Sequence, residues 1–419
     1  MADEWFDGVV MKTLEKLPTQ DRSVGLGMLA GIRVLDLTTS IAGPYATQLL
    51  ADMGAAVVKL ERPGVGDDTR AWGPPFLGEQ SLWFASVNRN KESMTLDVTH
   101  PDGSAILQRM VAESDVIVLN MVPGVQRKLG LDNARLKEIN SKIIHVSLTG
   151  FGLIGRRAEL SCYDLIAEGY SGVMDLTGEP ESGPQKVGTP AADLLAGQDV
   201  ALATLAAIVE RQRTGVGKAI DVSMVRSMVR FMSPRIMAYL GSGECPKRSG
   251  GRDSVIAVYQ VFDTADEPIT LGLGNDAIWQ RFWTAVGHPE CGNRKDFSTN
   301  ALRRSARAEI VGQIAEILLK KPRFEWLELF GQHRIPSGPI NRVDQLVDDR
   351  DLIDEGMFYA VSGREGLVPQ VGLGIRFDGS GEVHRSPPPG LGENTESILR
   401  SWLRLSRQEV DDLVAKRVV

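Results

Sequence analysis

Short runs of apolar and β-branched residues recur along the first part of the chain and predict buried strands. They are GIRVLDL (31–37), AAVVKLE (55–61), MTLDV (94–98), VIVLN (116–120) and KIIHVSLTG (142–150). Apolar residues at helical spacing occupy residues 40–55 and 101–115, between successive strands. Strands that alternate with helices are typical of βαβ units, so the pattern predicts a parallel sheet.

The middle of the chain contains the clearest helix and then a change of pattern. Residues 193–215 carry a continuous apolar face and end at Gly215, and residues 219–225 predict a further strand. A Gly-rich basic stretch follows. Residues 255–262 and 267–274 then alternate as antiparallel strands do, with helical stretches after them. We therefore expect an α/β protein with a second, smaller α+β domain, and one last helix near the C-terminus.

Composition excludes several classes of function. The chain has 419 residues and a formal net charge of -7, which argues against a binder of nucleic acid or of membrane surfaces. It has no run of 18 apolar residues, and MADEWFDGVV does not resemble a signal peptide. The three scattered cysteines fit a reducing compartment. We expect a cytoplasmic protein.

Familiar catalytic motifs are absent from the sequence. There is no GxGxxG after the first strand, and no GxxxxGK[ST], GxSxG or HExxH. Their absence opposes a dinucleotide site, a P-loop, an α/β-hydrolase and a zinc protease. The five histidines are scattered, so we expect no metal site.

A series of segments, in order, carries a resemblance to one family. They are residues 31–76, SLWFASVNRNK (81–91), NMVPGVQRKLG (120–130), SLTGFG (147–152), YDLIAEGYSGVMDLTG (163–178), RQRTGVGKAIDVSM (211–224), IPSGPINRV (335–343) and PPPGLGENT (387–395). The chain resembles the class III CoA-transferases, the family that includes formyl-CoA transferase and the α-methylacyl-CoA racemases. GDDTRAWGPPF (66–76) and SVNRNK (86–91) look most like its succinyl-CoA-dependent dicarboxylate branch.

The resemblance implies an architecture as well as an activity. It implies a large Rossmann-like domain with a parallel sheet, built from both ends of the chain, and a small α+β domain from the middle. The expected division is an N-terminal extension (1–28), large domain (29–225), linker (226–250), small domain (251–336), and a linker and return to the large domain (337–419). It also implies a homodimer of interlocked subunits, although a heteromer with a related chain stays open.

The family's nucleophile matches Asp164, in SCYDLIAEG (161–169). A carboxylate can attack a thioester and form a mixed anhydride and then an aspartyl-CoA thioester, which keeps the acyl group activated. Asp164 also fits the N-cap of the next helix, and the two roles are compatible because a helix N-terminus is positive. We interpret Cys162 as structural, since no histidine partner is visible.

Two alternatives to a transferase remain. Racemase relatives carry a histidine directly before the aspartate, where this chain has Tyr163, and a second aspartate that matches Asp193. A phenol is a poor base at neutral pH, which disfavours an acyl-CoA racemase or epimerase. A non-catalytic subunit of a heteromeric transferase is the other alternative, and Asp164 argues against it.

The resemblance also assigns binding residues. The expected CoA contacts are Ser40, Ile41, Ala42, Arg62, Leu96, Thr99, Asn120, Met121 and Lys128. CoA or acyl-CoA and a carboxylic acid are expected as substrates, with no permanently bound cofactor. On the substrate side we expect Tyr163, the loop glycines Gly250 and Gly251, and Arg252 as a partner for a carboxylate. Asn88 and Asn90 are alternatively loop-shaping residues, and Asn394 replaces the family's usual histidine.

Overall fold

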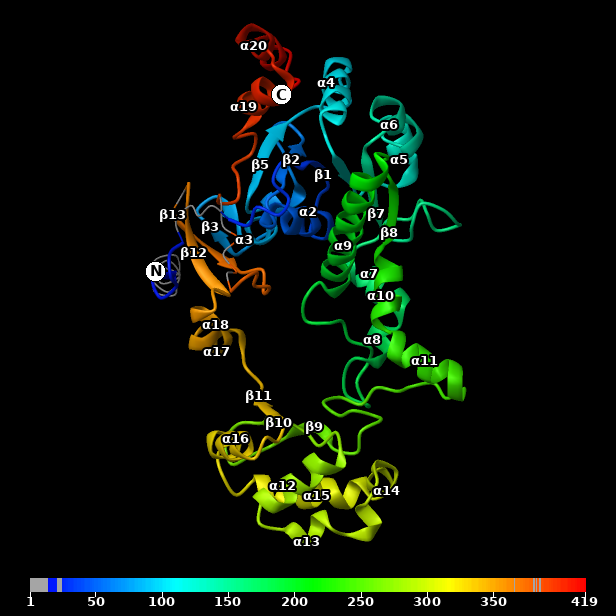
Figure 1. Ribbon diagram of the computed structural model, residues 1–419, viewed down its shortest axis with the longest axis vertical. Helices are drawn as coiled ribbons and strands as arrows, with labels where there is room; N and C mark the ends of the chain where they lie inside the picture. The colour runs from blue at the N-terminus through cyan, green and yellow to red at the C-terminus, as the bar shows by residue number, and fades with distance from the viewer. Residues whose placement is uncertain (1–13, 21–24, 365, 380, 382, 384–385) are drawn as a thin grey trace. The chain divides into compact units, whose positions relative to one another are not determined.

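The computed structural model describes residues 14–20, 25–364, 366–379, 381, 383 and 386–419 (Figure 1). The chain divides into two compact units. The large unit is Met1–Val173, Val187–Met237 and Asp349–Val419, and the small unit is Met174–Lys186 and Ala238–Asp348. The large unit thus takes in both ends of the chain. The small unit also includes residues 174–186, because Gly250 N donates to Gly178 O at 3.0 Å and joins that segment to the loop.

A six-stranded parallel sheet forms the centre of the large unit, in the order β5-β2-β1-β6-β7-β8. The strands are β1 (Arg33–Leu37), β2 (Ala56–Glu61), β5 (Lys91–Thr95), β6 (Val116–Leu119), β7 (Ile144–Thr149) and β8 (Ala219–Ser223). Each lies on or beside a predicted apolar run, so the predicted parallel sheet is confirmed. Such runs are buried on both faces because helices cover both sides of the sheet.

Alternate residues of the strands enter two different helical layers. Leu35, Val58 and Ile117 join a core with α4 (Pro101–Ala112), α6 (Asn133–Ile139), α19 (Thr395–Leu403) and α20 (Arg407–Ala415). The other face packs on α2 (Ala42–Asp52) and α9 (Ala191–Thr214). In Figure 1, α19 lies beside β5 and α4, and α20 packs on α19, so the C-terminal helices complete the first layer.

Helix α9 is the one described helix that is long and apolar enough to cross a membrane, judged by length and composition alone. Its buried residues are mostly small, including Ala196, Gly197 and Ala201. A Cβ on Gly197 would lie 2.7 Å from Ala42 O, so the backbones of α9 and α2 approach closely. The buried face of α9 therefore packs closely on α2.

The small unit is built on an antiparallel sheet and an aromatic core. Strands β9 (Tyr259–Phe262) and β10 (Ile269–Gly272) pair antiparallel as predicted, and β11 (Ser337–Pro339) adds a third strand. The helices are α12 (Asp276–Ala285), α13 (Pro289–Gly292), α14 (Asn300–Ser305), α15 (Arg307–Leu318), α16 (Arg323–Gln332) and α17 (Val343–Val347), with η2 (Lys295–Phe297). Trp279, Phe282, Trp283 and Phe330 are buried between them.

Several elements were not expected from the sequence. Strands β12 (Phe358–Gly363) and β13 (Gly366–Val371) form a hairpin, and residues 18–20 of the predicted N-terminal extension hydrogen-bond to Ala360. Residues 1–13 and 21–24 of that extension lie outside the described residues. One last helix was predicted, whereas two are present, because Ser406 and Glu409 form a capping box that starts α20.

The remaining elements are short or lie around the site. They are η1 (Asp68–Ala71), β3 (Phe76–Leu77), β4 (Gln80–Ser81), α3 (Leu82–Ser86), α5 (Pro123–Lys128), α7 (Asp164–Ser171), α8 (Val173–Leu176), α10 (Met224–Phe231), α11 (Ser233–Ser242) and α18 (Arg350–Asp354). Helices α10 and α11 occupy much of the predicted linker 226–250.

Candidate active site

Two pockets lie at the carboxyl ends of the parallel strands, where α/β sheets commonly bind ligands. The apolar pocket, of about 580 Å³, lies beyond β5, β2, β1 and β6 and is lined largely by Leu37, Leu60, Leu96, Val98, Met121 and Leu129. The polar pocket, of about 270 Å³, lies beyond β1, β6 and β7 and is lined by Asn120, Thr149, Tyr163 and Asp193 among others. Thr39 lines both pockets, so they adjoin at the end of β1.

Four of the residues expected to bind CoA line the apolar pocket, namely Arg62, Leu96, Thr99 and Met121. Arg62 Nη2 forms an ion pair with Asp68 Oδ1 at 2.6 Å on the exposed rim. Lys128 is exposed at the end of α5 and is not among the lining residues.

Four other predicted residues line the polar pocket, namely Ser40, Ala42, Asn120 and Tyr163. Asn120 clamps the backbone of Thr39, since Asn120 Nδ2 donates to Thr39 O at 2.8 Å and Asn120 Oδ1 accepts from Thr39 N at 3.2 Å. Ile41 is buried directly before α2, so its side chain belongs to the core rather than to either pocket. The β1–α2 turn is therefore the wall between the two pockets.

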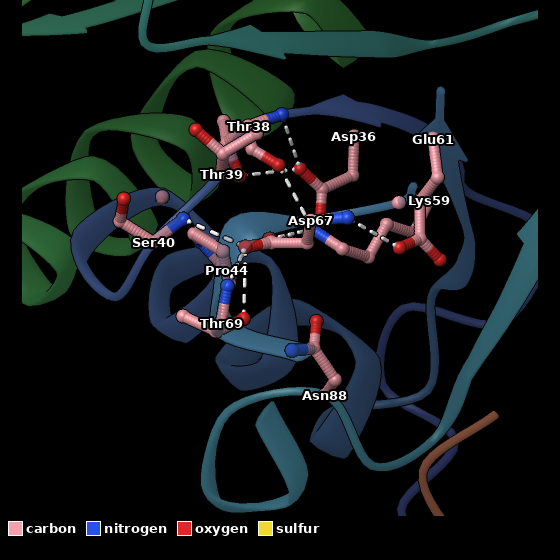
Figure 2. A network of polar contacts seen from close by, with 12 residues as sticks. Asp36, Thr38, Thr39, Ser40, Pro44, Lys59, Glu61, Asp67, Thr69 and Asn88 are labelled. Carbon is pink, nitrogen blue, oxygen red and sulfur yellow. Dashed lines mark hydrogen bonds and ion pairs between the residues drawn. The ribbon is translucent and has the colours of Figure 1, made fainter. Parts of the chain in front are cut away.

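The β1–α2 turn has a backbone conformation that needs support. Ser40 has φ of 68°, a left-handed value that costs a non-glycine residue energy. Its N–H donates to Asp67 Oδ1 at 3.1 Å, and the same oxygen accepts from Thr69 N and Thr69 Oγ1, as Figure 2 shows. Asp67 Oδ2 pairs with Lys59 Nζ at 2.7 Å, with both side chains fully buried. A buried ion pair thus anchors the turn.

A second buried pair lies beside the first. Lys91 Nζ contacts Asp36 Oδ2 at 3.1 Å and donates to Pro44 O and Asn88 Oδ1 at 2.8 Å. Burial would raise the pKa of Asp36, but Lys91 and Lys59 outweigh it and hold that pKa below its ordinary value. Burial lowers the pKa of Lys91 to about 8, because Asp36 only partly compensates and Lys59 repels it. These charges are structural, since their hydrogen bonds go to one another, to the backbone and to neutral side chains such as Asn88 and Thr47.

Asp164 lies at the start of α7, but its carboxylate caps a different helix. Its Oδ1 accepts from Ala192 N at 2.8 Å and from Asp193 N at 3.3 Å, in the first turn of α9. The residue before α9, Pro190, provides no side-chain cap. Asp164 is therefore a helix cap, as its sequence context allowed, but the helix that it caps is α9. The N-cap of its own helix, α7, is Tyr163. Among the described residues no donor meets Asp164 Oδ2, which leaves that oxygen for a ligand.

A second carboxyl group, that of Asp193, lies near Asp164 and lines the polar pocket. Burial, and after it the nearby Asp164 carboxylate, raise the pKa of Asp193 to about 7. Burial, Asp193 and Asp164 also raise the pKa of the Cys162 thiol to about 11, so this thiol stays protonated at neutral pH. Cys162 is therefore a poor nucleophile, and the carboxyl groups of Asp164 and Asp193 lie beside the polar pocket.

The glycine loop belongs to the small unit. Gly251 lines a hollow of about 350 Å³ with residues of β9 and β10. Gly250 has φ of 59°, and a Cβ there would lie 2.2 Å from Glu179 Oε2. The Arg252 guanidinium is exposed and donates to Ser249 O at 3.2 Å within its own loop.

The asparagines considered for binding have structural contacts. Asn88 donates to Phe84 O, and Asn90, with φ of 63°, bonds Asp52, Val383 O and Ser386 N. Asn394 Oδ1 accepts from Ser93 N at 3.0 Å and fixes the C-terminal segment to β5. All three therefore shape the backbone around the sheet.

Some site residues escaped the sequence-based prediction. Thr39 adjoins a predicted residue, and the motif at 31–76 could have pointed to it. Arg417 lines the apolar pocket from the last residues of the chain, where no motif indicates it. No group of three or more metal-ligating side chains comes together within the described part of the chain.

Comparison with known proteins gives a family match over most of the chain. Residues 29–395 match the model of CoA-transferase family III. The chain is similar to the succinyl-CoA:glutarate CoA-transferase of Homo sapiens, with 34% identity over 93% of this chain and 90% of the relative. It is also similar to the succinate–glutarate CoA-transferase of Agrobacterium fabrum, with 35% identity over 90% of this chain and 96% of that one. A solved CAIB/BAIF family protein from Brucella suis is 36% identical, with a TM-score of 0.79 over 91% of this chain and 100% of its own.

Proposed function

Because this chain belongs to CoA-transferase family III and is an enzyme of that class, we propose that it moves CoA from succinyl-CoA to a dicarboxylic acid with Asp164 as the covalent nucleophile. The donor and the kind of acceptor follow the names of the relatives above. The placement of Asp164 carries the proposal: one carboxylate oxygen is docked on the amides of α9, beside a polar pocket that adjoins an apolar one.

The pockets suggest how CoA is arranged. The apolar pocket takes the nucleotide, with Arg62, Leu96, Thr99 and Met121 around it, and Lys128 lies on the neighbouring helix. The thioester end passes the Thr39–Ala42 turn into the polar pocket, toward Tyr163 and Asp164. Gly250, Gly251 and Arg252 remain proposed contacts to the acyl or acceptor carboxylate.

The chemistry proceeds in four balanced steps. Asp164 attacks the succinyl-CoA carbonyl and the C–S bond breaks. CoA thiolate departs, and a mixed anhydride of Asp164 and succinate forms. The thiolate attacks the aspartyl carbonyl, giving aspartyl-CoA thioester and succinate. The acceptor carboxylate then attacks this thioester, which releases CoA thiolate and forms a second anhydride. The thiolate finally attacks the acceptor carbonyl, which gives the acceptor's CoA thioester and regenerates Asp164. The α9 amides that hold Oδ1 supply donors for the oxyanions formed at the aspartyl carbon.

A homodimer is part of the proposal. Leu165, Ile166 and Tyr170 of α7 and Val229 and Phe231 of α10 are exposed apolar side chains within the large unit. Burying them against a second copy would remove apolar area from water. Light scattering after size exclusion tests this, and co-purification of a related chain would favour the heteromer instead.

Intact-protein mass spectrometry tests the covalent step. After incubation with succinyl-CoA and hydroxylamine, the wild type should carry a hydroxamate that maps to Asp164. Asp164→Ala should carry none, whereas Cys162→Ala should still be labelled because the neighbouring thiol takes no part. No adduct with any acyl-CoA would refute the aspartyl intermediate. Solvent deuterium uptake at the α-carbon would then indicate a racemase.

A further inference from the structure

Arg417 is the cation on the rim of the apolar pocket that has no partner in the described part of the chain. The other charged lining residues are engaged: Arg62 with Asp68, Glu61 with Arg70, and Asp67 with Lys59. Asp97 accepts two hydrogen bonds from Thr99, at 2.6 and 2.9 Å. The guanidinium of Arg417 is exposed and is therefore available to an anion that enters the pocket.

The segment that carries Arg417 is fixed in place, although it is the end of the chain. Val418 is fully buried in the core, its carbonyl accepts from Asp97 N at 2.7 Å, and its N–H donates to Leu413 O at 2.9 Å. On the other side of Arg417, Lys416 Nζ pairs with Asp102 Oδ2 at 2.7 Å. Arg417 itself has φ of 57°, as the chain turns after α20. Its backbone is thus held on both sides, and the residue lines the apolar pocket.

The sheet order gives the direction in which Arg417 faces the ligand. Asp97, to which the tail bonds, follows β5, the edge strand of the order β5-β2-β1-β6-β7-β8. The polar pocket with Tyr163 and Asp193 lies beyond β1, β6 and β7. Arg417 is therefore at the end of the apolar pocket remote from the reacting carboxylates. In CoA the group farthest from the thioester is the adenosine, whose ribose carries a 3′-phosphate.

We propose that Arg417 is a binding residue that pairs with the ribose 3′-phosphate of CoA. The inference rests on the proposed function, in that the apolar pocket takes the nucleotide end. A guanidinium offers two parallel donors to phosphate oxygens, which a lysine cannot match in geometry. Arg417 therefore selects CoA over the same molecule without that phosphate.

Calorimetric titration of the full-length protein with CoA and with 3′-dephospho-CoA tests the assignment. Arg417→Ala should weaken CoA binding by about tenfold, in line with one exposed charge-assisted contact, and leave 3′-dephospho-CoA binding unchanged. Arg417→Lys should recover part of the loss. Arg404→Ala is the matched control, because Arg404 also follows a helix with φ of 57° but lies outside both pockets.

Two results would overturn the proposal. An unchanged affinity of Arg417→Ala for CoA would show that Arg417 does not contact CoA. An equal loss of affinity for both ligands would show that Arg417 contacts a part of CoA other than the 3′-phosphate. If the wild type binds neither ligand, the proposed nucleotide pocket fails, and the role of Arg417 fails with it. Thermal melting of each variant separates these outcomes from unfolding.

Discussion

The two pockets that meet at Thr39 differ in whether the carboxylates beside them are paired with cations. Around the apolar pocket each acid of the underlying network is matched by a cation, as in Lys59–Asp67, Lys91–Asp36 and Arg70–Glu61. Beside the polar pocket Asp164 and Asp193 lie close to each other, and within the described residues no cation forms an ion pair with either.

We infer that the paired carboxylates support the backbone, whereas the unpaired ones are available for chemistry. A neutralised carboxylate is a weak nucleophile but a firm anchor, and the matched pairs hold the turn that lines both pockets. Asp164, held by two amides through one oxygen, keeps its other oxygen unengaged within the described residues. The raised pKa of Asp193 shows that this corner does not accommodate a second charge at low cost. Substitutions on one side at a time can test this difference.

Replacing Asp164 should have the largest effect. Asp164→Asn keeps an acceptor for the α9 amides but removes the nucleophile, so transferase activity should fall by about a thousandfold or more. Steady-state assay of CoA transfer measures it, with circular dichroism to confirm folding. Activity within tenfold of the wild type would mean that Asp164 is only a helix cap.

Breaking the matched pair at Lys59 should cost stability rather than chemistry. Lys59→Met leaves Asp67 and Asp36 buried without this cation, and the free energy of unfolding should fall by about 3–5 kcal/mol. Arg62→Met is the control in the same pocket, because the exposed Arg62–Asp68 pair should contribute less than about 1 kcal/mol. Urea unfolding compares the two.

A double variant sharpens the result for Lys59. Lys59→Met with Asp67→Asn removes both charges but keeps an oxygen for Ser40 and Thr69, so part of the lost stability should return. Equal losses for the single and double variants would show that packing, rather than the unpaired charge, dominates.

Asp193 should give the large unit a distinct pH dependence. Its pKa is raised from 3.8 to about 7 in the folded state, so the folded protein retains the proton after the unfolded chain has lost it. The contribution of Asp193 to stability is therefore greatest below about pH 4 and should fall by about 2–4 kcal/mol as pH rises to about 7. Urea unfolding of Asp193→Asn at both pH values should lack this decline. A decline of equal size in the variant would assign it to other groups.

The smallest effect is expected at Ser40. Glycine accepts φ of 68° without strain but is more flexible when unfolded, so Ser40→Gly should change stability by less than about 1 kcal/mol. Ser40→Val should lose about 1–2 kcal/mol, because a β-branched residue is strained in the left-handed region. Thermal melting ranks the three proteins, and a Val variant as stable as the Gly variant would show that the turn can relax.

Local pattern predicted the parallel sheet well but not the network beneath the site. The runs at β1, β2 and β6 could also have been helix fragments, but their short length and β-branched residues favoured strands, which the structure confirms. Lys59 and Lys91 are charged residues in strands, and pattern alone does not show that they are buried. Their burial depends on Asp36 and Asp67, which other segments bring to them.

The candidate site shows the same limit. The motif pointed to Asp164, yet the amides it caps are 28 and 29 residues later in the chain. Arg417 lies in no motif, and only the packing of Val418 brings it to the pocket. The β12–β13 hairpin was missed because Pro369 interrupts an otherwise strand-like run.

The composition of the large unit also governs when it can form during synthesis. The layer that covers one face of β5 includes α19, α20 and Val418, which follow the small unit in the sequence. The small unit, largely residues 238–348, is complete while that face still lacks its cover. Nascent chains therefore leave part of this hydrophobic sheet face uncovered until residues 395–418 have been synthesised, which exposes it to non-native contacts.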